Sequence, residues 1–122
     1  MQKRYLIKLS DKNEKVRVDD KTELNLRELE TGILQVLFEF SANASKDRKT
    51  INKSLDSAGR VENLTDTEDL IVDEEDLKFI ETGLGEITGS RRPYSWTKAR
   101  NLFKQLADPQ ELEEEKENAE ES

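Results

Sequence analysis

Apolar and polar positions along the chain predict a small fold that mixes strands and helices. Residues Arg4–Leu9 are rich in aromatic, β-branched and aliphatic side chains and stop at the polar turn Ser10–Asn13, which is typical of a strand. Val16, Arg17 and Val18 alternate apolar and polar beyond that turn. We therefore expect an N-terminal β-hairpin with a loop of about three to five residues. Because an isolated hairpin is marginal in water, it must pack on the rest of the domain.

The clearest helix pattern begins at Asn25, a favourable N-terminal cap that is followed three residues later by Glu28, as in a capping box. Gly32, in the interior, costs up to about 1 kcal/mol relative to Ala and indicates a close crossing with another element. Large apolar residues recur near the helical period and predict a central core helix over residues 26–41: Leu26, Leu29, Ile33, Val36, Leu37 and Phe40.

A second, thinner helix is expected after Ser45, whose hydroxyl can cap it. Ile51, Leu55 and Ala58 would share its buried face, and Gly59 is well placed to end it. This pattern indicates a solvated amphipathic helix, with one half of a basic face as the functional alternative. Cations crowd its other faces: Lys46, Arg48, Lys49 and Lys53.

Acidic residues mark the start of a third helix at Asp73, because carboxylates oppose the helix dipole at an N-terminus. The short run Leu70–Val72 before it is either a third strand or a buried entry to this helix. The helix should end at Gly83 and Gly85. Its apolar stripe is Leu77, Ile80 and Leu84, with Phe79 beside it.

A last helix is expected to begin at Pro93 or Ser95 and to stop before Pro109. Its apolar residues repeat at spacings of three and four: Trp96, Ala99, Leu102, Phe103 and Leu106. The single Trp is therefore expected to anchor this helix in the core, and a partly exposed binding role is the alternative.

From Gln110 onward the chain is almost entirely Glu, and it is too poor in large apolar residues to offset its ordering entropy. We expect one folded domain over residues 1–108 and a disordered acidic tail over 109–122. The fold class is α+β and mostly helical, with an N-terminal β-hairpin, about four helices and an optional third strand.

Composition excludes several chemistries, because the 122 residues contain no His and no Cys. Catalytic Ser-His-Asp and Cys-His units cannot form from this chain, and neither can zinc sites built on these residues. We expect no metal and no cofactor. No apolar run approaches the roughly 20 residues that span a bilayer, and the N-terminus lacks the apolar region of a signal peptide. We therefore expect a cytoplasmic protein.

Charge is segregated along the chain, whose formal net charge is −8. Residues 61–86 and 108–122 are strongly acidic, whereas residues 87–107 carry Lys and Arg but no acid. Asymmetry of this kind indicates binding partners.

Two further motifs contain residue types that can carry chemistry. The acidic cluster lacks the spacing of a calcium-binding loop, and acids at a helix start are ordinary, so structural roles are favoured over metal binding or a metal-dependent hydrolase. Residues 83–89 contain three glycines but match neither a dinucleotide-binding fingerprint nor a P-loop. The acidic cluster comprises Asp66, Glu68, Asp69, Asp73, Glu74, Glu75 and Asp76.

The basic segment 91–104 is the most informative, because cations interleaved with aromatic residues can hold phosphate and stack bases. Arg91 and Arg92 would lie just before a helix N-terminus, a natural anion site. The plain alternative is that these cations cover the solvated face of the last helix. The candidate binding residues are Arg91, Arg92, Tyr94, Lys98, Arg100 and Lys104.

The order of elements resembles that of small acidic accessory proteins encoded by bacteriophages. The matching pieces are Leu26–Phe40, Thr50–Ala58, Leu70–Ile80 and Pro93–Leu106. The resemblance implies a viral or mobile-element origin, a host-cytoplasmic location and no enzymatic activity. It transfers no functional residues.

Together these features predict a non-enzymatic interaction protein that binds another protein, either a host factor or a virion component. The surfaces expected to be involved are the basic segment 91–104 and the tail 110–121. The alternative is a nucleic-acid-binding protein that uses the same basic segment, with the acidic tail as an internal competitor.

Overall fold

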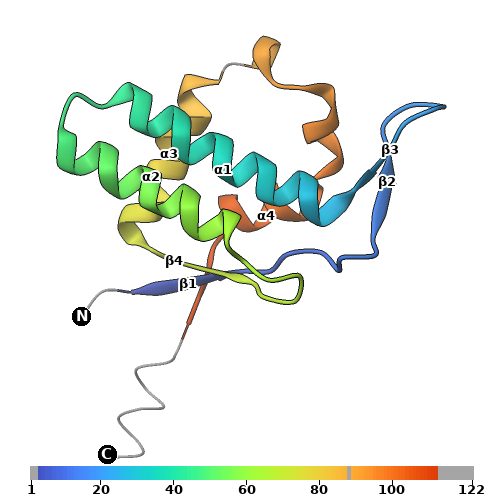
Figure 1. The fold of residues 1–122 in the computed structure, drawn as a ribbon, viewed down its shortest axis with the longest axis horizontal. Coiled ribbons are helices and arrows are strands. Elements are labelled where there is room, and N and C mark those ends of the chain that lie inside the picture. Colours follow the sequence, from blue (N-terminus) through green and yellow to red (C-terminus); the bar gives the residue numbers. More distant parts are fainter. Residues whose placement is uncertain (1–2, 88, 113–122) are drawn as a thin grey trace, which may run out of the picture.

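A computed structural model describes residues 3–87 and 89–112 of this chain. Helices stack above a small antiparallel sheet, and a separate two-stranded hairpin stands at one side (Figure 1). The predicted class, α+β and mostly helical, is confirmed. In chain order the elements are β1 (Arg4–Ile7), β2 (Lys15–Arg17), β3 (Glu23–Asn25), α1 (Leu26–Ala44), α2 (Arg48–Glu62), β4 (Leu70–Asp73), α3 (Glu74–Glu86), the 3₁₀ helices η1 (Gly89–Arg91) and η2 (Tyr94–Lys98), α4 (Arg100–Ala107) and β5 (Gln110–Glu111).

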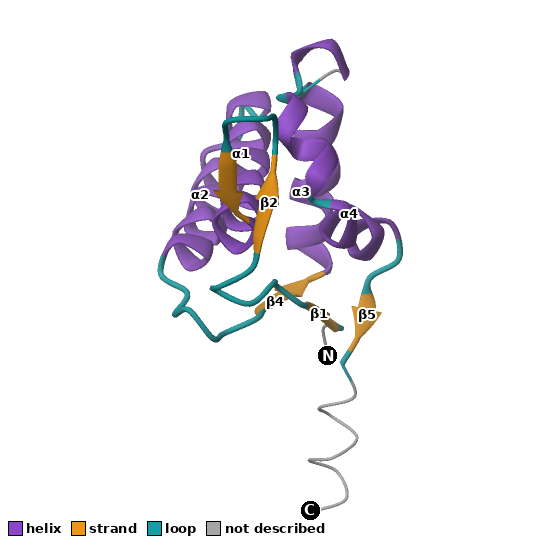
Figure 2. Ribbon diagram, turned by 90° about the vertical axis from the view of Figure 1, so that its right-hand side faces the viewer, coloured by secondary structure: helices purple, strands orange, loops and turns teal. Residues whose placement is uncertain are grey.

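The sheet is assembled from strands that are distant in sequence, in the order β4-β1-β5 (Figure 2). β1 lies in the middle, where Tyr5 is opposite Val72 on one side and opposite Glu111 on the other. Residues 70–72, left open between a strand and a helix entry, therefore belong to a strand. Ile7, Leu70 and Val72 are buried on the helix side of the sheet.

The N-terminal hairpin exists, but its predicted pairing of residues 4–9 with 16–18 was wrong. β2 pairs with β3 instead, with Val16 opposite Leu24. The turn between them is tightened by Asp19, whose carboxylate accepts from the backbone N–H groups of Lys21 and Thr22 at 2.8 Å each. Strand β1 is apolar enough to be the central strand of a sheet that has one face packed on the helices, whereas the charged strand β2 suits an exposed ribbon.

Lys8 and Leu9, which were predicted to continue the first strand, form backbone hydrogen bonds with side chains and not with another strand. The Gln105 carboxamide accepts from the Lys8 N–H at 2.7 Å and donates to the Lys8 carbonyl at 2.8 Å. The next N–H, of Leu9, donates to the Asp69 carboxylate at 2.9 Å. The strand ends early because these two side chains satisfy its backbone where neighbouring strands stop.

We expect Gln105→Ala to lower the free energy of unfolding by about 1–2 kcal/mol, because it leaves two backbone groups of Lys8 without their partner. Asn101→Ala, one turn earlier on α4, is the matched control and should change stability much less. Urea unfolding of both variants measures the difference, and equal stabilities would contradict the role assigned to Gln105.

Helix α1 is the centre of the core, as predicted, and extends to Ala44. Asn25 caps it, because its side chain accepts from the Glu28 N–H at 3.0 Å. Ile33, Leu34, Leu37 and Phe38 are almost completely buried. Helix α1 contacts both α2 and α3. It is therefore the helix on which the other two pack.

Helix α2 differs from the prediction in its cap, its end and its buried face. Asp47 caps it in place of Ser45, and the helix continues through Gly59 to Glu62. Its buried face carries small residues, since Ser54 is fully buried and donates its hydroxyl to the Phe38 carbonyl at 2.6 Å. Leu55, predicted to face the core, is 46% exposed. Small residues face α1 because they let the two helix backbones approach closely.

The close helix crossing is made by Gly83, whereas Gly32 was predicted to make it. A methyl group built on Gly83 would overlap the backbone carbonyl of Leu37, but one built on Gly32 would meet no atom within 4 Å. Gly83 therefore lies inside α3 as a packing residue, and α3 continues to Glu86. The predicted start is confirmed, because Asp73 caps the helix and forms a capping box with Asp76.

The C-terminal segment is broken where a single helix was predicted. Tyr94–Lys98 form a 3₁₀ helix, Ala99 leaves helical geometry, and α4 begins only at Arg100. The predicted tail boundary after residue 108 was also wrong, because Gln110 and Glu111 pair with β1 and the Leu112 N–H donates to the Arg4 carbonyl at 2.8 Å. The exposed edge of β1 gives this segment its partners. The rest of the predicted tail, 113–122, lies outside the described residues.

A buried polar cluster at the start of α1 holds two loops against the helix. The Glu30 carboxylate, 1% exposed, accepts from the Ser10 N–H at 2.7 Å and from the Ser10 hydroxyl at 2.9 Å. One turn earlier, the buried Arg27 guanidinium donates to the carbonyls of Ser10, Thr65 and Glu68. The loops that enter and leave the sheet are thus tied to the same helical turn.

Candidate functional site

The segment after α3 is folded back over the end of that helix by Arg92. Its Nε donates to the Ile87 carbonyl at 3.0 Å and its Nη2 donates to the Leu84 carbonyl at 3.2 Å. These carbonyls lie at the C-terminus of α3, where the last helical carbonyls lack partners and a cation is favoured. Arg92 therefore has a structural role in addition to the binding role predicted for it.

Residues 94–98 then form a short, internally bonded turn. The Trp96 N–H donates to the Pro93 carbonyl at 3.0 Å, and the Thr97 hydroxyl donates to the Tyr94 carbonyl at 2.7 Å. The turn directs Trp96 inward, where only 7% of it is exposed, and leaves Tyr94 65% exposed. Trp96 is thus the core anchor predicted, although from a 3₁₀ helix.

An open hollow of about 480 Å³ lies between this turn and α4. The rings of Trp96 and Phe103 stand 6.1 Å apart at 35°, and the Lys98 ammonium lies 5.6 Å from the centroid of the Tyr94 ring. Most of the lining is apolar. It also includes Arg92, whose guanidinium is held in place by the Ile87 and Leu84 carbonyls. The lining residues are Gly89, Arg92, Pro93, Tyr94, Trp96, Thr97 and Phe103.

The six candidate residues do not form one surface. Arg92 and Tyr94 line the aromatic hollow, and Lys98 contacts Tyr94. Lys104 lines a different hollow, together with Lys8, Gln105 and Gln110. Since a helix turns about 100° per residue, Gln105 lies on the opposite side of α4 from Phe103, and Lys104 lies between them. Arg91 and Arg100 are exposed and line neither hollow.

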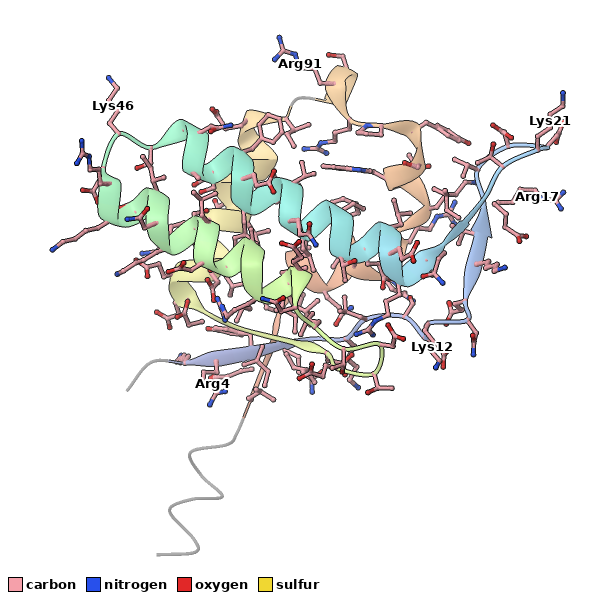
Figure 3. All side chains as sticks on the ribbon, viewed as in Figure 1. Arg4, Lys12, Arg17, Lys21, Lys46 and Arg91 are labelled. Atoms are coloured by element: carbon pink, nitrogen blue, oxygen red, sulfur yellow. The ribbon has the colours of Figure 1, made fainter. Side chains whose placement is uncertain are left out.

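Figure 3 shows how widely exposed cations are spread, with Arg91 above the helices, Arg17 and Lys21 on the hairpin, and Arg4 and Lys12 near the sheet. The predicted anion site before a helix N-terminus does not form at Arg91 and Arg92. The element that follows them is a 3₁₀ helix of five residues, and its first turn has no side-chain cap. Phosphate binding there loses its main structural support.

The sequence pattern predicts Trp96 and Phe103 in the core stripe, with a partly exposed binding role as the alternative for Trp96 alone. Both are largely buried, but their edges reach the hollow and form its wall. The available signal was their spacing of seven residues, which would bring them to one side of a continuous helix. The break at Ala99 changes that geometry and opens the hollow.

The acidic cluster is used within the fold. Asp76 accepts from the Arg60 guanidinium at 2.7 Å and from the Ser57 hydroxyl, and Glu75 pairs with Lys53 at 3.4 Å. Glu68 accepts from the Thr65 N–H at 2.8 Å, which lowers the pKa of its carboxyl. Over residues 3–87 and 89–112, acidic side chains form no group that could hold a metal ion.

The remaining lowered pKa values also belong to exposed turns and caps. A hydrogen bond from the Thr50 side chain lowers the pKa of Asp47, the cap of α2, and the Lys21 N–H lowers the pKa of Asp19 in the hairpin turn. These carboxylates tighten local backbone and lie on elements other than those that line the aromatic hollow.

Comparison of the chain with protein families, curated proteins and solved structures finds no match. In the part of the chain that the structure describes, no helix is both long and apolar enough to cross a membrane.

Proposed function

We propose that this chain is a non-enzymatic interaction protein that binds a partner protein through the aromatic hollow. The observation that carries the proposal is the hollow itself, in which Tyr94, Trp96 and Phe103 surround an apolar space within a segment, 87–107, that has no acidic residue. Protein-binding hot spots are rich in Tyr, Trp and Arg, and their apolar centres carry a polar rim.

The resemblance to small phage accessory proteins supports a host factor or a virion component as the partner. The surface is suited to such a partner because the Arg92 guanidinium and the 94–98 turn are already held in place by hydrogen bonds. A preformed site loses less conformational entropy when it binds.

Nucleic acid is the second candidate, and the exposed cations Arg91 and Arg100 favour it. Two observations weigh against it. The Trp96 ring is buried, and one face of the Tyr94 ring is taken by Lys98. Base stacking needs exposed aromatic faces, so this surface is better suited to a protein.

The full chain is immobilised and used to capture its natural partner from a nuclease-treated lysate. We expect Tyr94→Ala to abolish this capture. The free energy of unfolding of the variant should stay within about 0.5 kcal/mol of the wild type. Tyr94 is largely exposed, so the loss reports on binding instead of folding. Phe40→Ala, which removes an aromatic ring that is also exposed, is the matched control and should retain the partner. Capture that survives Tyr94→Ala would overturn the assignment of this surface, and capture that occurs only from a lysate without nuclease treatment would favour the nucleic-acid function.

A further inference from the structure

We infer that the hollow takes an acidic segment of the partner protein, with one large apolar side chain inserted beside Trp96 and Phe103. The inference rests on the proposed function and specifies the chemistry of the partner. It has two parts, an apolar anchor and flanking carboxylates, which are supported by different observations.

The apolar anchor follows from the shape and lining of the hollow. Its volume of about 480 Å³ is at the lower end of ligand pockets in proteins, which suits one large side chain with a little of its backbone. Trp96 and Phe103 form the wall, and Tyr94 is exposed at the edge, where an inserted side chain would bury it. Aromatic side chains contribute most of the energy at interfaces of this kind.

The carboxylates that we expect on either side of the partner's anchor follow from the charges of segment 87–107, which contains every residue that lines the hollow. Lys98 lies over Tyr94, Arg91 and Arg100 are exposed on either side in sequence, and no acid occurs from residue 87 to 107. A partner with negative charge beside its anchor would be attracted over a distance and oriented on arrival.

Arg92 gives the site a directed donor. Its Nε and Nη2 are held by the Ile87 and Leu84 carbonyls, while its Nη1 has no partner among the described residues. A guanidinium fixed by two hydrogen bonds can offer the remaining nitrogen to a carboxylate with little further loss of side-chain entropy.

The acidic C-terminal segment of the chain itself lacks the required anchor. Residues 113–122 contain Ala119 but no aromatic or branched aliphatic side chain. Leu112 is the nearest large apolar residue, and its backbone is bonded to Arg4 beside β1. This segment can compete through charge alone, so the occupant with an anchor comes from another protein.

The test uses fluorescence of Trp96, the only Trp in the chain, as a reporter of the hollow. The full chain is titrated with a short capped peptide in which one Phe is flanked by glutamates. Three comparison peptides replace the Phe by Ala, replace the glutamates by glutamines, or copy residues 113–122. We expect saturable changes in emission with the first peptide and at least tenfold weaker binding with each of the others.

Variants of the chain separate the two parts of the inference. Tyr94→Ala should weaken binding of the Phe-containing acidic peptide about tenfold, and Arg91→Ala should weaken it and reduce its salt dependence. Phe40→Ala and Lys46→Ala are the matched controls, since Lys46 lies at the turn between α1 and α2, well separated from Arg91 (Figure 3). Both controls should bind like the wild type.

Equal binding of the glutamine peptide would overturn the acidic part, and equal binding of the Ala peptide would overturn the anchor. No binding by any peptide would overturn the whole inference, while capture of the natural partner that still depends on Tyr94 would leave the proposed function standing. A larger quenching of Trp96 emission by a single-stranded oligonucleotide than by the acidic peptide would overturn both the inference and the proposed protein-binding function. It would favour the nucleic-acid alternative.

Discussion

Replacing Gly83 by Ala is expected to lower the free energy of unfolding by about 2 kcal/mol, although Ala is the better helix former. The added methyl group would overlap the backbone carbonyl of Leu37 on α1. Since neither partner of this contact is a flexible side chain, α1 and α3 would have to move apart. The movement would loosen the stripe of α1 that carries Leu37 and Phe38, both fully buried.

Thermal unfolding measures this effect, because 1 kcal/mol shifts the Tm of a domain of this size by about 4 °C. Gly32→Ala and Gly85→Ala are the controls, as a methyl group at either position would meet no atom within 4 Å. Both should raise stability slightly, by up to about 1 kcal/mol, through helix propensity. Equal effects of Ala at positions 83 and 85 would contradict the close crossing.

Replacing Glu30 by Ala is expected to cost about 2–3 kcal/mol, because it leaves the Ser10 N–H without its acceptor next to a buried helix face. It also releases one of the contacts that hold the loop after β1 against α1. Glu30→Gln keeps a shape that can accept from the Ser10 N–H and donate to its hydroxyl, so it should cost less than about 1 kcal/mol. Glu28→Ala, an exposed position on the same turn, is the matched control.

The pH dependence of the Glu30→Gln variant gives an independent test. Burial raises the pKa of the Glu30 carboxyl above its ordinary value of 4.5, and the hydrogen bonds from Ser10 oppose this only in part. The folded chain therefore holds this proton more tightly than the unfolded chain does. The resulting stabilisation is present below the unfolded pKa and is lost as pH rises through the folded pKa.

The glutamine variant has no such carboxyl, so its stability relative to wild type should increase as pH rises from about 4 toward neutrality. Chemical denaturation of both proteins across that range measures the difference. A difference that stays constant with pH would show that Glu30 is not protonated more readily in the folded state.

Local signals in the sequence were enough for the features that depend on neighbouring residues. The cap at Asn25 and the acid-led start of α3 at Asp73 involve groups within about one turn of each other, and each was predicted at the right residue. The stripe of α1 was predicted only in part, because Ile33 and Leu37 are buried but Phe40 is 41% exposed. Leu34 and Phe38, which were not in the predicted stripe, are fully buried. The burial of Trp96 was also predicted, since a lone Trp at helical spacing from other apolar residues is best satisfied in a core.

The pairing of the strands could not be predicted from neighbouring residues. The pattern of β1 predicts a strand but carries no information on its partner, and turn signals favoured the nearest strand in sequence. The actual neighbours, β4 and β5, are brought to β1 by the packing of α1, α3 and α4 above it. Local turn chemistry therefore predicted a hairpin while the pairing of β1 was decided across most of the chain.

Helix faces and close contacts also depended on the partner surface. Leu55 fits a helical stripe by hydrophobicity but is exposed, and the small side chain of Ser54 faces the core because α1 lies close to α2. Of the predicted face, Ala58 is buried as expected. The two interior glycines, Gly32 and Gly83, look alike in sequence, and only the approach of Leu37 distinguishes them. Hydrophobicity ranks single residues, whereas packing selects pairs of surfaces.

The candidate site shows the same division. Its composition, cations and aromatics without acids, is a property of the chain and was visible in residues 87–107. Its shape is not, because the break at Ala99 and the bonds of Arg92 to the Leu84 and Ile87 carbonyls turn one expected helical face into an aromatic hollow and a separate surface around Lys104. Sequence determines which chemical groups are present, and the long-range contacts of the folded chain determine which of them meet.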